Sequence, residues 1–543
     1  MREVLPKLCG ADIELGNFIL GLQRPNGTGE LASRALLREI HARYSNSDPL
    51  EPSNPRTPKP SSPRAPEPFL CRSNPQDWGR KFLSSNGGCA YIDLDHLELC
   101  IPEVISAYDH VAAWHAMLRI ARDALRAANA RLRDGMSIQV LVNNSDGRGN
   151  AYGSHLNFLV SRRAWDNLFE RKMHHLLYLA SYQVSSIVFT GQGKVGAENG
   201  APPVAFQLSQ RADFFETLTG MQTTFRRPIV NSRDEPLCGH GRITPAAGPP
   251  AAGAPTVGAR LHCIFFDNTL CHVASLLKVG VMQLILTLLE AERVNPELIL
   301  DDPVDAVWRW SHDPVLRARA RTVAGRRLTA VEMQLLFLEE AQRFAAEGRY
   351  DGIVPRAGEI LALWEDTLLK LKAGDVSALA SRLDWVLKFR ILQRVLLKRS
   401  DLTWASPEIK HLDHLYGSLD EENGLYWAYE KLGVTEQVVP AARIEHFVHE
   451  PPEDTRAWTR AMMLRMGGQA VHDVDWDRIK FRQTGRRYWP VVRTLHLANP
   501  LEFTRAATEN AIRKATSLDE ILDELEASEP DVDAMPTLYD ARG

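Results

Sequence analysis

Acidic side chains with strand-like spacing are the residues of this sequence best suited to chemistry. In residues 86–103, NGGCAYIDLDHLELCIPE, apolar residues alternate with Asp93 and Asp95. A β-strand with this pattern buries one face and presents both carboxylates on the other. After Asp95 the alternation slips by one residue, which predicts a β-bulge that turns Asp93 and Glu98 toward one cavity. The alternative is an edge strand whose acids face only water.

A second acidic strand is predicted near the N-terminus. In LCGADIELGNFIL, Asp12 and Glu14 alternate with apolar residues. Two carboxylates at positions i and i+2 of one strand face repel each other unless a cation lies between them. This spacing favours a metal site, and a polar strand face in water is the alternative.

Histidine and arginine side chains occur on further predicted strands. They are His155 in residues 143–162, Arg211 in residues 205–215, Arg233 in residues 226–236, and Arg260 and His262 in residues 258–267. Hard oxygen ligands suit Mg²⁺, and guanidinium groups suit phosphate oxygens, so the set favours a Mg²⁺–polyphosphate site. A lone histidine on a strand is also commonly a structural polar residue. The sequence has no GxxxxGK[ST] motif, so this is not a P-loop.

The elements that must position these residues are strands followed by helices. Apolar spacing predicts helices over residues 30–44 and 106–133 and a strand over residues 136–142. Beyond residue 278 the chain is predicted to be helical, over residues 279–293, 329–347, 359–373 and 376–399. We therefore expect an α+β fold.

Composition excludes several classes of protein. The chain has 543 residues, 44% of them hydrophobic and 24% charged, with a net charge of −4, which argues against a nucleic-acid or membrane surface. Its seven cysteines form no CxxC pair, which argues against a disulfide framework or a structural zinc site. We see neither a signal segment nor 18 consecutive apolar residues and expect a soluble cytoplasmic protein.

Residues 49–75 interrupt this pattern with nine prolines among serine, asparagine and basic residues. Such a mixture lacks the apolar content for a core. We predict a mobile loop over residues 45–80 that covers the acidic site, with an inert insertion as the alternative.

Eight blocks in order carry a resemblance to a known family. They are NGGCAYIDLDHLELCIPE, NNSDGRGNAYGSHLNFL, FQLSQRADF, VNSRDEP, RLHCIFFD, LLKVG, LDWVLKFRIL and PPEDTRAW. Together they resemble the family of the Pup ligase and the Pup deamidase/depupylase, within the glutamine synthetase-like carboxylate-amine ligases. The resemblance implies a curved, mostly antiparallel sheet that cradles ATP and Mg²⁺, flanked by helices. It also implies a catalytic domain over residues 1–430, a small C-terminal domain over residues 431–497 and a helical or flexible tail over residues 498–543.

The same resemblance implies roles for individual residues. Asp93 corresponds to the catalytic aspartate. Metal-site positions are Asp12, Glu14, Glu98 and His155, and nucleotide-binding candidates are Arg211, Arg233, His262 and Arg456. The spacing from Asn86 through Asp93 to Glu98 matches the depupylase form, because the ligase form has one more residue after the aspartate. The proline-rich loop also lies where depupylases carry a long insertion.

Four positions depart from the family pattern. Asp12 replaces a glutamate, Leu156 follows His155 where a glutamate is usual, Leu237 replaces a histidine, and His272 replaces a glutamate. These departures are compatible with a divergent member acting on another substrate and with a partly disabled enzyme.

Three functions follow from this resemblance. The first is an ATP- and Mg²⁺-dependent hydrolase that splits a glutamyl side-chain amide or isopeptide bond. The second is a ligase that joins a glutamate side chain to an amine, and the third is a catalytically weak homologue that binds a nucleotide or a tagged protein. The implied partner is a small Glu- or Gln-ended protein modifier, its conjugates, or another glutamyl substrate.

Overall fold

The computed structural model describes residues 4–24, 27–45, 80–147, 149–235, 237, 242–243, 256–483 and 491–526. Apart from residues 45 and 80, the predicted loop over residues 45–80 lies outside this part of the chain. Cysteines in the described part are free and buried.

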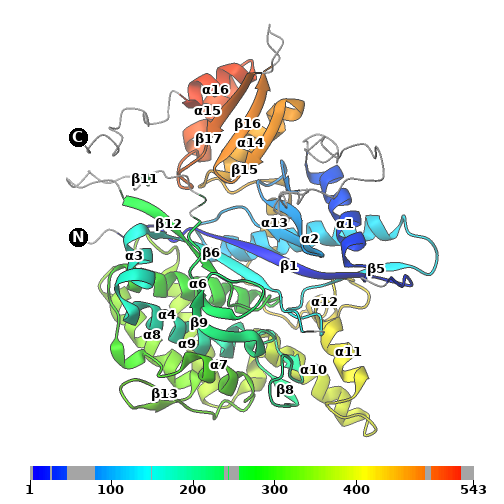
Figure 1. Ribbon diagram of the computed structural model, residues 1–543, viewed down its shortest axis with the longest axis vertical. Coiled ribbons are helices and arrows are strands. Elements are labelled where there is room, and N and C mark those ends of the chain that lie inside the picture. The colour runs from blue at the N-terminus through cyan, green and yellow to red at the C-terminus, as the bar shows by residue number, and fades with distance from the viewer. Residues whose placement is uncertain are drawn as a thin grey trace, which may run out of the picture.

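An eight-stranded antiparallel sheet forms the centre of the fold (Figure 1). Its strands are β1 (Cys9–Leu20), β2 (Lys81–Phe82), β3 (Cys89–Asp93), β4 (His96–Cys100), β5 (Ser137–Leu141), β6 (Ser154–Ser161), β11 (Arg242–Ile243) and β12 (Thr256–Cys263). The strand order is β11-β12-β6-β1-β4-β3-β2, and β5 pairs with the far half of β1. The α+β fold with a mostly antiparallel sheet is thus confirmed.

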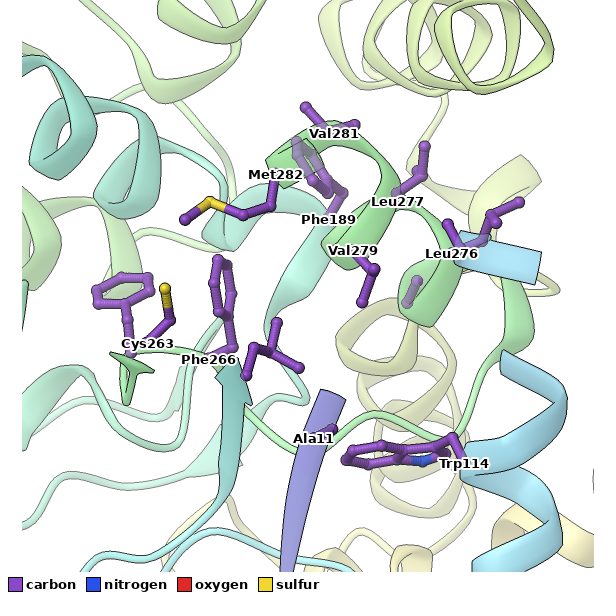
Figure 2. Close-up of a cluster of buried hydrophobic side chains, with 14 of the residues drawn as sticks. Ala11, Trp114, Phe189, Cys263, Phe266, Leu276, Leu277, Val279, Val281 and Met282 are labelled. Carbon is purple, nitrogen blue, oxygen red and sulfur yellow. The ribbon is translucent and has the colours of Figure 1, made fainter. Parts of the chain in front are cut away.

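The two faces of this sheet differ sharply in chemistry. Apolar residues of β1, β4, β6 and β12 share one face and are buried, among them Ile13, Leu99 and Leu261. Figure 2 shows Ala11 and Cys263 of this face beside side chains of α6 and Trp114. Because side chains alternate along a strand, the acids and histidines occupy the opposite face.

Helices cover the apolar face and extend the fold below it (Figure 1). They are α1 (Gly29–Tyr44), α2 (Ala107–Asn129), α3 (Arg162–Asp166), α4 (Met173–Ser185), α5 (Ile187–Thr190), α6 (His272–Glu290), α7 (Pro303–Ser311), α8 (Ala330–Ala346), α9 (Ala357–Lys372), α10 (Asp384–Lys398), α11 (Pro407–Tyr416), α12 (Leu425–Lys431) and α13 (Ala441–His449). The predicted helices are confirmed with changes at their ends, except that the one predicted over residues 376–399 is divided into a short 3-10 helix, η5 (Val376–Leu379), and α10. Among the described residues α6 alone is long and apolar enough to cross a membrane, and it is wholly buried as a core helix.

The predicted bulged strand over residues 86–103 is wrong in one respect, because the chain reverses there. Asp93 pairs with His96, so β3 and β4 form a hairpin with a two-residue turn at Leu94 and Asp95. Asp95 is therefore an exposed turn residue and does not share a strand face with Asp93. The slip in alternation marks the turn. Asp93 and Glu98 still lie on the same face, because Tyr91, the cross-strand partner of Glu98, is two residues from Asp93.

The predicted strand over residues 205–215 is also wrong for most of its length. Before Phe215 only β8 (Phe206–Gln207) is extended, and it is followed by an irregular segment and a short 3-10 helix, η3 (Ala212–Phe214). Here the backbone does not pair with a neighbouring strand. Instead, the amide N–H of Gln210 donates a hydrogen bond to Asp267 Oδ2 at 2.9 Å. Downstream, β9 (Phe215–Gly220) and β10 (Arg227–Asn231) form a separate parallel pair.

A second hydrophobic core lies near the C-terminus, coloured orange to red in Figure 1. It is built from α14 (Ala457–Gly467), β15 (Val471–Asp475), β16 (Arg478–Gln483), β17 (Val491–His496), α15 (Arg505–Lys514) and α16 (Leu518–Glu526). In sequence, the buried residues of this core run from Met463 to Leu525. We therefore propose that the small C-terminal domain includes part of the predicted tail over residues 498–543.

A buried ion cluster joins this C-terminal unit to the end of β4. Glu103 accepts hydrogen bonds from Arg456 Nε at 2.8 Å and from Arg460. Burial alone would raise the pKa of the Glu103 carboxyl, but Arg460 and Arg456 lower it to about 2. Since that pKa is depressed, the cluster stabilises the fold above the unfolded-state pKa, and this contribution is lost as the pH falls toward 2.

Glu103→Ala is expected to destabilise the protein by roughly 3–5 kcal/mol at pH 7, because it leaves the charges of Arg456 and Arg460 buried without a carboxylate. The difference from wild type should shrink as the pH falls from about 4 toward 2. Urea unfolding checks both points. The matched control is Glu453→Ala, which removes the exposed Arg505 pair and should cost less than about 1 kcal/mol. If the two variants lose the same free energy of unfolding, a structural role for the cluster is contradicted.

Candidate active site

Strand register brings the predicted acids together on the polar face. Asp12 pairs with Cys100 on β4 and with His155 on β6, and Glu14 pairs with Glu98. Directly paired residues on antiparallel strands point to the same side of a sheet. The carboxylates of Asp12, Glu14 and Glu98 and the ring of His155 therefore converge without help from any loop.

A pocket with an empty volume of about 1140 Å³, its open mouth included, lies over this face. Seven of the predicted site residues line it: Asp12, Asp93, Glu98, His155, Arg233, His262 and Arg456. Glu14 adjoins it through the acid cluster, and Arg211 lies outside the lining. The wall also includes Trp476 and Pro500, so the C-terminal unit helps to form the site.

The carboxylates of the site are buried close to one another. Burial, together with the Glu14 and Asp12 carboxylates, raises the pKa of Glu98 well above its usual value. Burial also raises the pKa of Asp12 and of Glu14, against the opposing effects of Arg260 and Arg211. A cation would relieve this repulsion and desolvation.

The donor atoms fit a divalent metal ion in two overlapping sets. Ligand atoms of Asp12, Glu98 and His155 lie within 4.8 Å of one another, and so do those of Glu14, Asp93 and Glu98. Burial and the nearby His262 lower the pKa of His155, which keeps it neutral as ligation requires. Its Nε2 is buried without a hydrogen-bond partner among the described residues and lies 3.7 Å from Glu14 Oε2. Glu98 belongs to both sets.

Arg211 lies behind Glu14, with its guanidinium against Gly153. A Cβ at Gly153 would meet Arg211 Nη1 at 2.5 Å, so only glycine admits this arrangement. Within the part of the chain that the structure describes, Arg211 Nε and Nη2 are buried without hydrogen-bond partners. Burial and the nearby Arg227 lower the pKa of Arg211 to about 9. Two buried, unpaired donors fit an anionic ligand such as phosphate.

The basic side chains of the pocket lining form a second group. His262 Nδ1 lies 2.9 Å from Asn157 Oδ1, which also accepts a hydrogen bond from Arg260. Arg233 is half-buried, with its Nε 3.9 Å from Glu235. Arg233 and Arg260 present positive charge and hydrogen-bond donors beside the acid cluster, whereas burial and the nearby Arg260 lower the pKa of His262 well below its usual value.

Arg456 reaches the pocket wall, but its donors bond to protein. Besides Glu103, it donates to the carbonyl oxygens of Leu237, at 2.8 Å, and Leu497, at 2.7 Å. Its predicted role in nucleotide binding stays a prediction.

Comparison with known proteins assigns the chain to a family. The Pup-ligase protein family matches residues 8–480. The chain is 35% identical over 438 residues to the depupylase of Acidothermus cellulolyticus, which covers 81% of this chain and 82% of the relative. The chain belongs to this family. It is also 33% identical to the Pup deamidase/depupylase of Mycolicibacterium smegmatis, over 73% of this chain and 74% of the relative. A Pup–protein ligase of Acidimicrobium ferrooxidans is 33% identical, over 76% of this chain and 86% of the relative.

Solved structures of the Pup-ligase family share the fold. The complex between prokaryotic ubiquitin-like protein Pup and its ligase PafA matches with a TM-score of 0.73 at 21% identity, over 96% of this chain and 92% of that chain. PafA in complex with ADP matches with a TM-score of 0.65 at 22% identity, over 94% of this chain and 96% of that chain. Curated members of the family are enzymes named for either ligation or depupylation.

The four departures from the family pattern do not affect the site equally. Although Asp12 is shorter than glutamate, its carboxylate still supplies a ligand atom to the first set. It also accepts a hydrogen bond from Asn157 at 3.2 Å. Leu156 is fully buried on the opposite, apolar face of β6, so it removes no group from the acid cluster. His272 is buried at the start of α6, with its ring 4.2 Å from that of His115, outside the pocket lining. Leu237 lies in the pocket wall.

Sequence reasoning missed several residues of the pocket. Asn157 alternates with His155 and pairs with Gly10, a signal that the strand pattern already contained. Arg227, the first residue of β10, lies outside the pocket lining but close enough to Arg211 to lower its pKa. Trp476 and Arg80 come from segments distant in sequence and carry no local pattern that indicates the site.

Proposed function

We propose that this protein is an ATP- and Mg²⁺-dependent hydrolase of glutamyl side-chain amide or isopeptide bonds, as in depupylation or Pup deamidation. The observation that carries the proposal is the position of Glu98. It belongs to both ligand sets, and in the second set it lies beside Asp93. Support for hydrolysis over ligation comes from the two-residue turn after Asp93, which is the shorter, depupylase-like spacing.

Asp93 is the group we assign to the bond-breaking step. It ends β3, is half-buried, and lines the pocket, so water and substrate can reach its carboxylate. It accepts a proton from water, or attacks the glutamyl carbonyl carbon itself, and the carbon–nitrogen bond breaks as the nitrogen takes up a proton. Water in total adds across the bond and yields a glutamate side chain and free amine or ammonia.

The other residues bind and orient. Asp12, Glu14, Glu98 and His155 would hold Mg²⁺, while Arg211, Arg233 and His262 would orient the phosphates of ATP. When bound, Mg²⁺ would act as a Lewis acid that stabilises negative charge on the glutamyl carbonyl oxygen. Trp476 and apolar residues such as Phe158 also line the pocket.

We propose Pup or Pup–protein conjugates as substrates, since relatives are named for Pup and one solved neighbour is a ligase bound to Pup. No nucleic acid or membrane enters this proposal. We place the enzyme in the cytoplasm because its described cysteines are free thiols.

Ligation is the second candidate, because the Acidimicrobium ferrooxidans relative is a ligase at 33% identity. In that reaction Asp93 would deprotonate the attacking lysine amine. Incubation of the protein with Mg·ATP and Pup, with and without an amine acceptor, separates the candidates. Ammonia or amine release indicates hydrolysis, conjugate formation indicates ligation, and binding without either product indicates a catalytically weak homologue.

Addition of Mg·ATP is expected to raise the melting temperature by roughly 3 °C at a hundredfold excess over Kd, because ligand binds only the folded state. Thermal denaturation with ATP and Mg²⁺, ATP with EDTA, and Mg²⁺ alone measures the effect. Absence of any shift at millimolar Mg·ATP would contradict nucleotide binding in the cradle.

A further inference from the structure

The position of Arg211 depends on an irregular segment of the chain. Arg211 lies between β8 and η3, where the backbone forms neither a helix nor a sheet. Within the described residues its guanidinium donates only to the carbonyl oxygen of Phe266, from Nη1 at 3.5 Å, while Nε and Nη2 are buried without hydrogen-bond partners. A hydrogen bond of that length is weak. The contacts that hold the backbone of the segment therefore decide where the guanidinium lies.

The buried carboxylate of Asp267 holds this segment. Its Oδ2 accepts hydrogen bonds from the backbone N–H groups of Gln210, at 2.9 Å, and of Gln192, at 2.8 Å. Its Oδ1 accepts a hydrogen bond from Ser209 Oγ at 2.9 Å. Ser209 Oγ in turn accepts a hydrogen bond from the backbone N–H of Arg211 at 3.2 Å. Two hydrogen bonds in series thus join the Asp267 carboxylate to the backbone of Arg211.

The backbone around Asp267 is itself fixed, and it also contacts the strand that carries His155. The ring of Phe266 lies in the hydrophobic core (Figure 2), and its carbonyl oxygen accepts a hydrogen bond from the backbone N–H of Ser154 at 3.4 Å. The carbonyl oxygen of Asp267 accepts a hydrogen bond from Lys278 Nζ at 3.0 Å, and the same ammonium group lies 3.4 Å from Ser154 Oγ. Ser154 directly precedes His155 on β6. Asp267 is therefore anchored to the same strand as a candidate metal ligand.

We propose that Asp267 is a positioning residue, which holds Arg211 where its guanidinium can bind the phosphates of ATP. This inference rests on the proposed function and names what fixes one of its nucleotide-binding groups. Asp267 is buried and lies outside the pocket lining, so it acts through Arg211 and not by touching the ligand. A group that orients a ligand has to be held within about 0.5 Å of its working position, and supporting hydrogen bonds do this.

Asp267→Asn tests this role directly, because it keeps the shape of the side chain but replaces one acceptor oxygen by an NH₂ donor. At least one of the three groups that donate to the carboxylate then faces another donor, and the segment has to shift. Loss of such a supporting group typically costs about 10- to 100-fold in ligand affinity or activity. We expect Kd for Mg·ATP, measured by calorimetry, to rise about tenfold.

Asp384→Asn is the matched control. Asp384 is also buried, and its carboxylate likewise accepts hydrogen bonds from two backbone N–H groups, those of Leu270 and Cys271, and from one hydroxyl, that of Tyr416 at 2.9 Å. None of these groups belongs to the segment that carries Arg211. Both substitutions should lower the melting temperature, but the control should leave Kd for Mg·ATP within about twofold of wild type. An equal rise of Kd in both variants would show general loosening and overturn the positioning role.

A double-mutant cycle shows whether Asp267 acts through Arg211. Arg211→Ala alone should raise Kd for Mg·ATP about 10- to 100-fold, because it removes hydrogen bonds from a charged donor. Addition of Asp267→Asn to this variant should change Kd by less than about twofold, since the group that Asp267 positions is gone. Ser209→Ala removes only the hydroxyl between the two residues and should raise Kd about threefold. It carries the same test if Asp267→Asn does not fold.

The outcomes separate this inference from the proposed function. Unchanged Kd in Asp267→Asn and Ser209→Ala, or full additivity with Arg211→Ala, would overturn the positioning role alone. Normal Mg·ATP binding in Arg211→Ala, or no Mg·ATP binding to wild type, would overturn it together with the proposed nucleotide site. The expected pattern of Kd values without turnover of Pup supports the positioning role and rejects only the hydrolase proposal.

Discussion

Asp93→Asn is expected to lower turnover at least about a hundredfold, because it removes the oxygen that acts as base or nucleophile while keeping the size of the side chain. Asp93 ends β3, and its ligand atom lies within 4.8 Å of those of Glu14 and Glu98. Asp93 does not belong to the first ligand set, so Asp12, Glu98 and His155 are untouched. Binding of Mg·ATP, measured by calorimetry, should therefore survive the substitution.

Asp95→Asn is the matched control for this result. Asp95 is two residues away, but its side chain is exposed in the hairpin turn. What the structure uses there is its carbonyl oxygen, which accepts a hydrogen bond from Asn17 at 3.0 Å and is unchanged in the variant. Turnover of Asp95→Asn should stay within about twofold of wild type. Similar losses in the two variants, or loss of Mg·ATP binding in Asp93→Asn, would mean that Asp93 is a metal ligand and not the catalyst.

Glu98→Gln is expected to reduce activity at least about a hundredfold as well, by a different route. Glu98 is the one residue common to both ligand sets, so its loss weakens every metal position that the described residues offer. A metal ion typically supplies several kcal/mol of transition-state stabilisation, and about 2.7 kcal/mol corresponds to a hundredfold in rate. The Mg²⁺ concentration that gives half-maximal activity should rise in parallel.

In Glu98→Gln the stability of the metal-free protein should stay the same or rise, although activity falls. Burial and the neighbouring acids raise the pKa of Glu98, so an uncharged glutamine relieves repulsion in metal-free protein. Its melting temperature in EDTA should equal or exceed that of wild type, whereas added Mg²⁺ should stabilise wild type more. The control Glu30→Gln removes an exposed acid of α1 and should alter neither measurement. Normal Mg²⁺ dependence in Glu98→Gln would refute the shared metal site.

The faces of the sheet could be predicted from sequence because strand alternation is local. Asp12, Glu14, Glu98 and His155 share a face for this reason, and register then brings them together. Reversal of the chain after Asp93 could not be predicted, since Leu94 and Asp95 are not a usual hairpin pair and Leu94 adopts a positive φ there.

Other errors arose from long-range contacts. The segment around Arg211 alternates like a strand, but its polar groups bond to Asp267, which lies far away in sequence. The role of Arg456 in nucleotide binding stays a prediction, which only its family block indicates. Its commitment to Glu103 depends on how the C-terminal unit packs against the end of β4. No local pattern contains such contacts, and the same holds for Trp476 in the pocket wall.

Isotope transfer from water tests the hydrolase proposal most directly. Purified protein is incubated in H₂¹⁸O with Mg·ATP and one of three substrates: glutamine-ended Pup, a Pup–lysine conjugate, or glutamate-ended Pup together with a lysine acceptor. The products are weighed by mass spectrometry. We predict release of ammonia or of the free lysine amine, with one ¹⁸O in the side-chain carboxylate of the terminal glutamate, and loss of this product in Asp93→Asn. Formation of new conjugates with matching release of ADP, and no ¹⁸O in Pup, would contradict hydrolysis and identify the protein as a ligase.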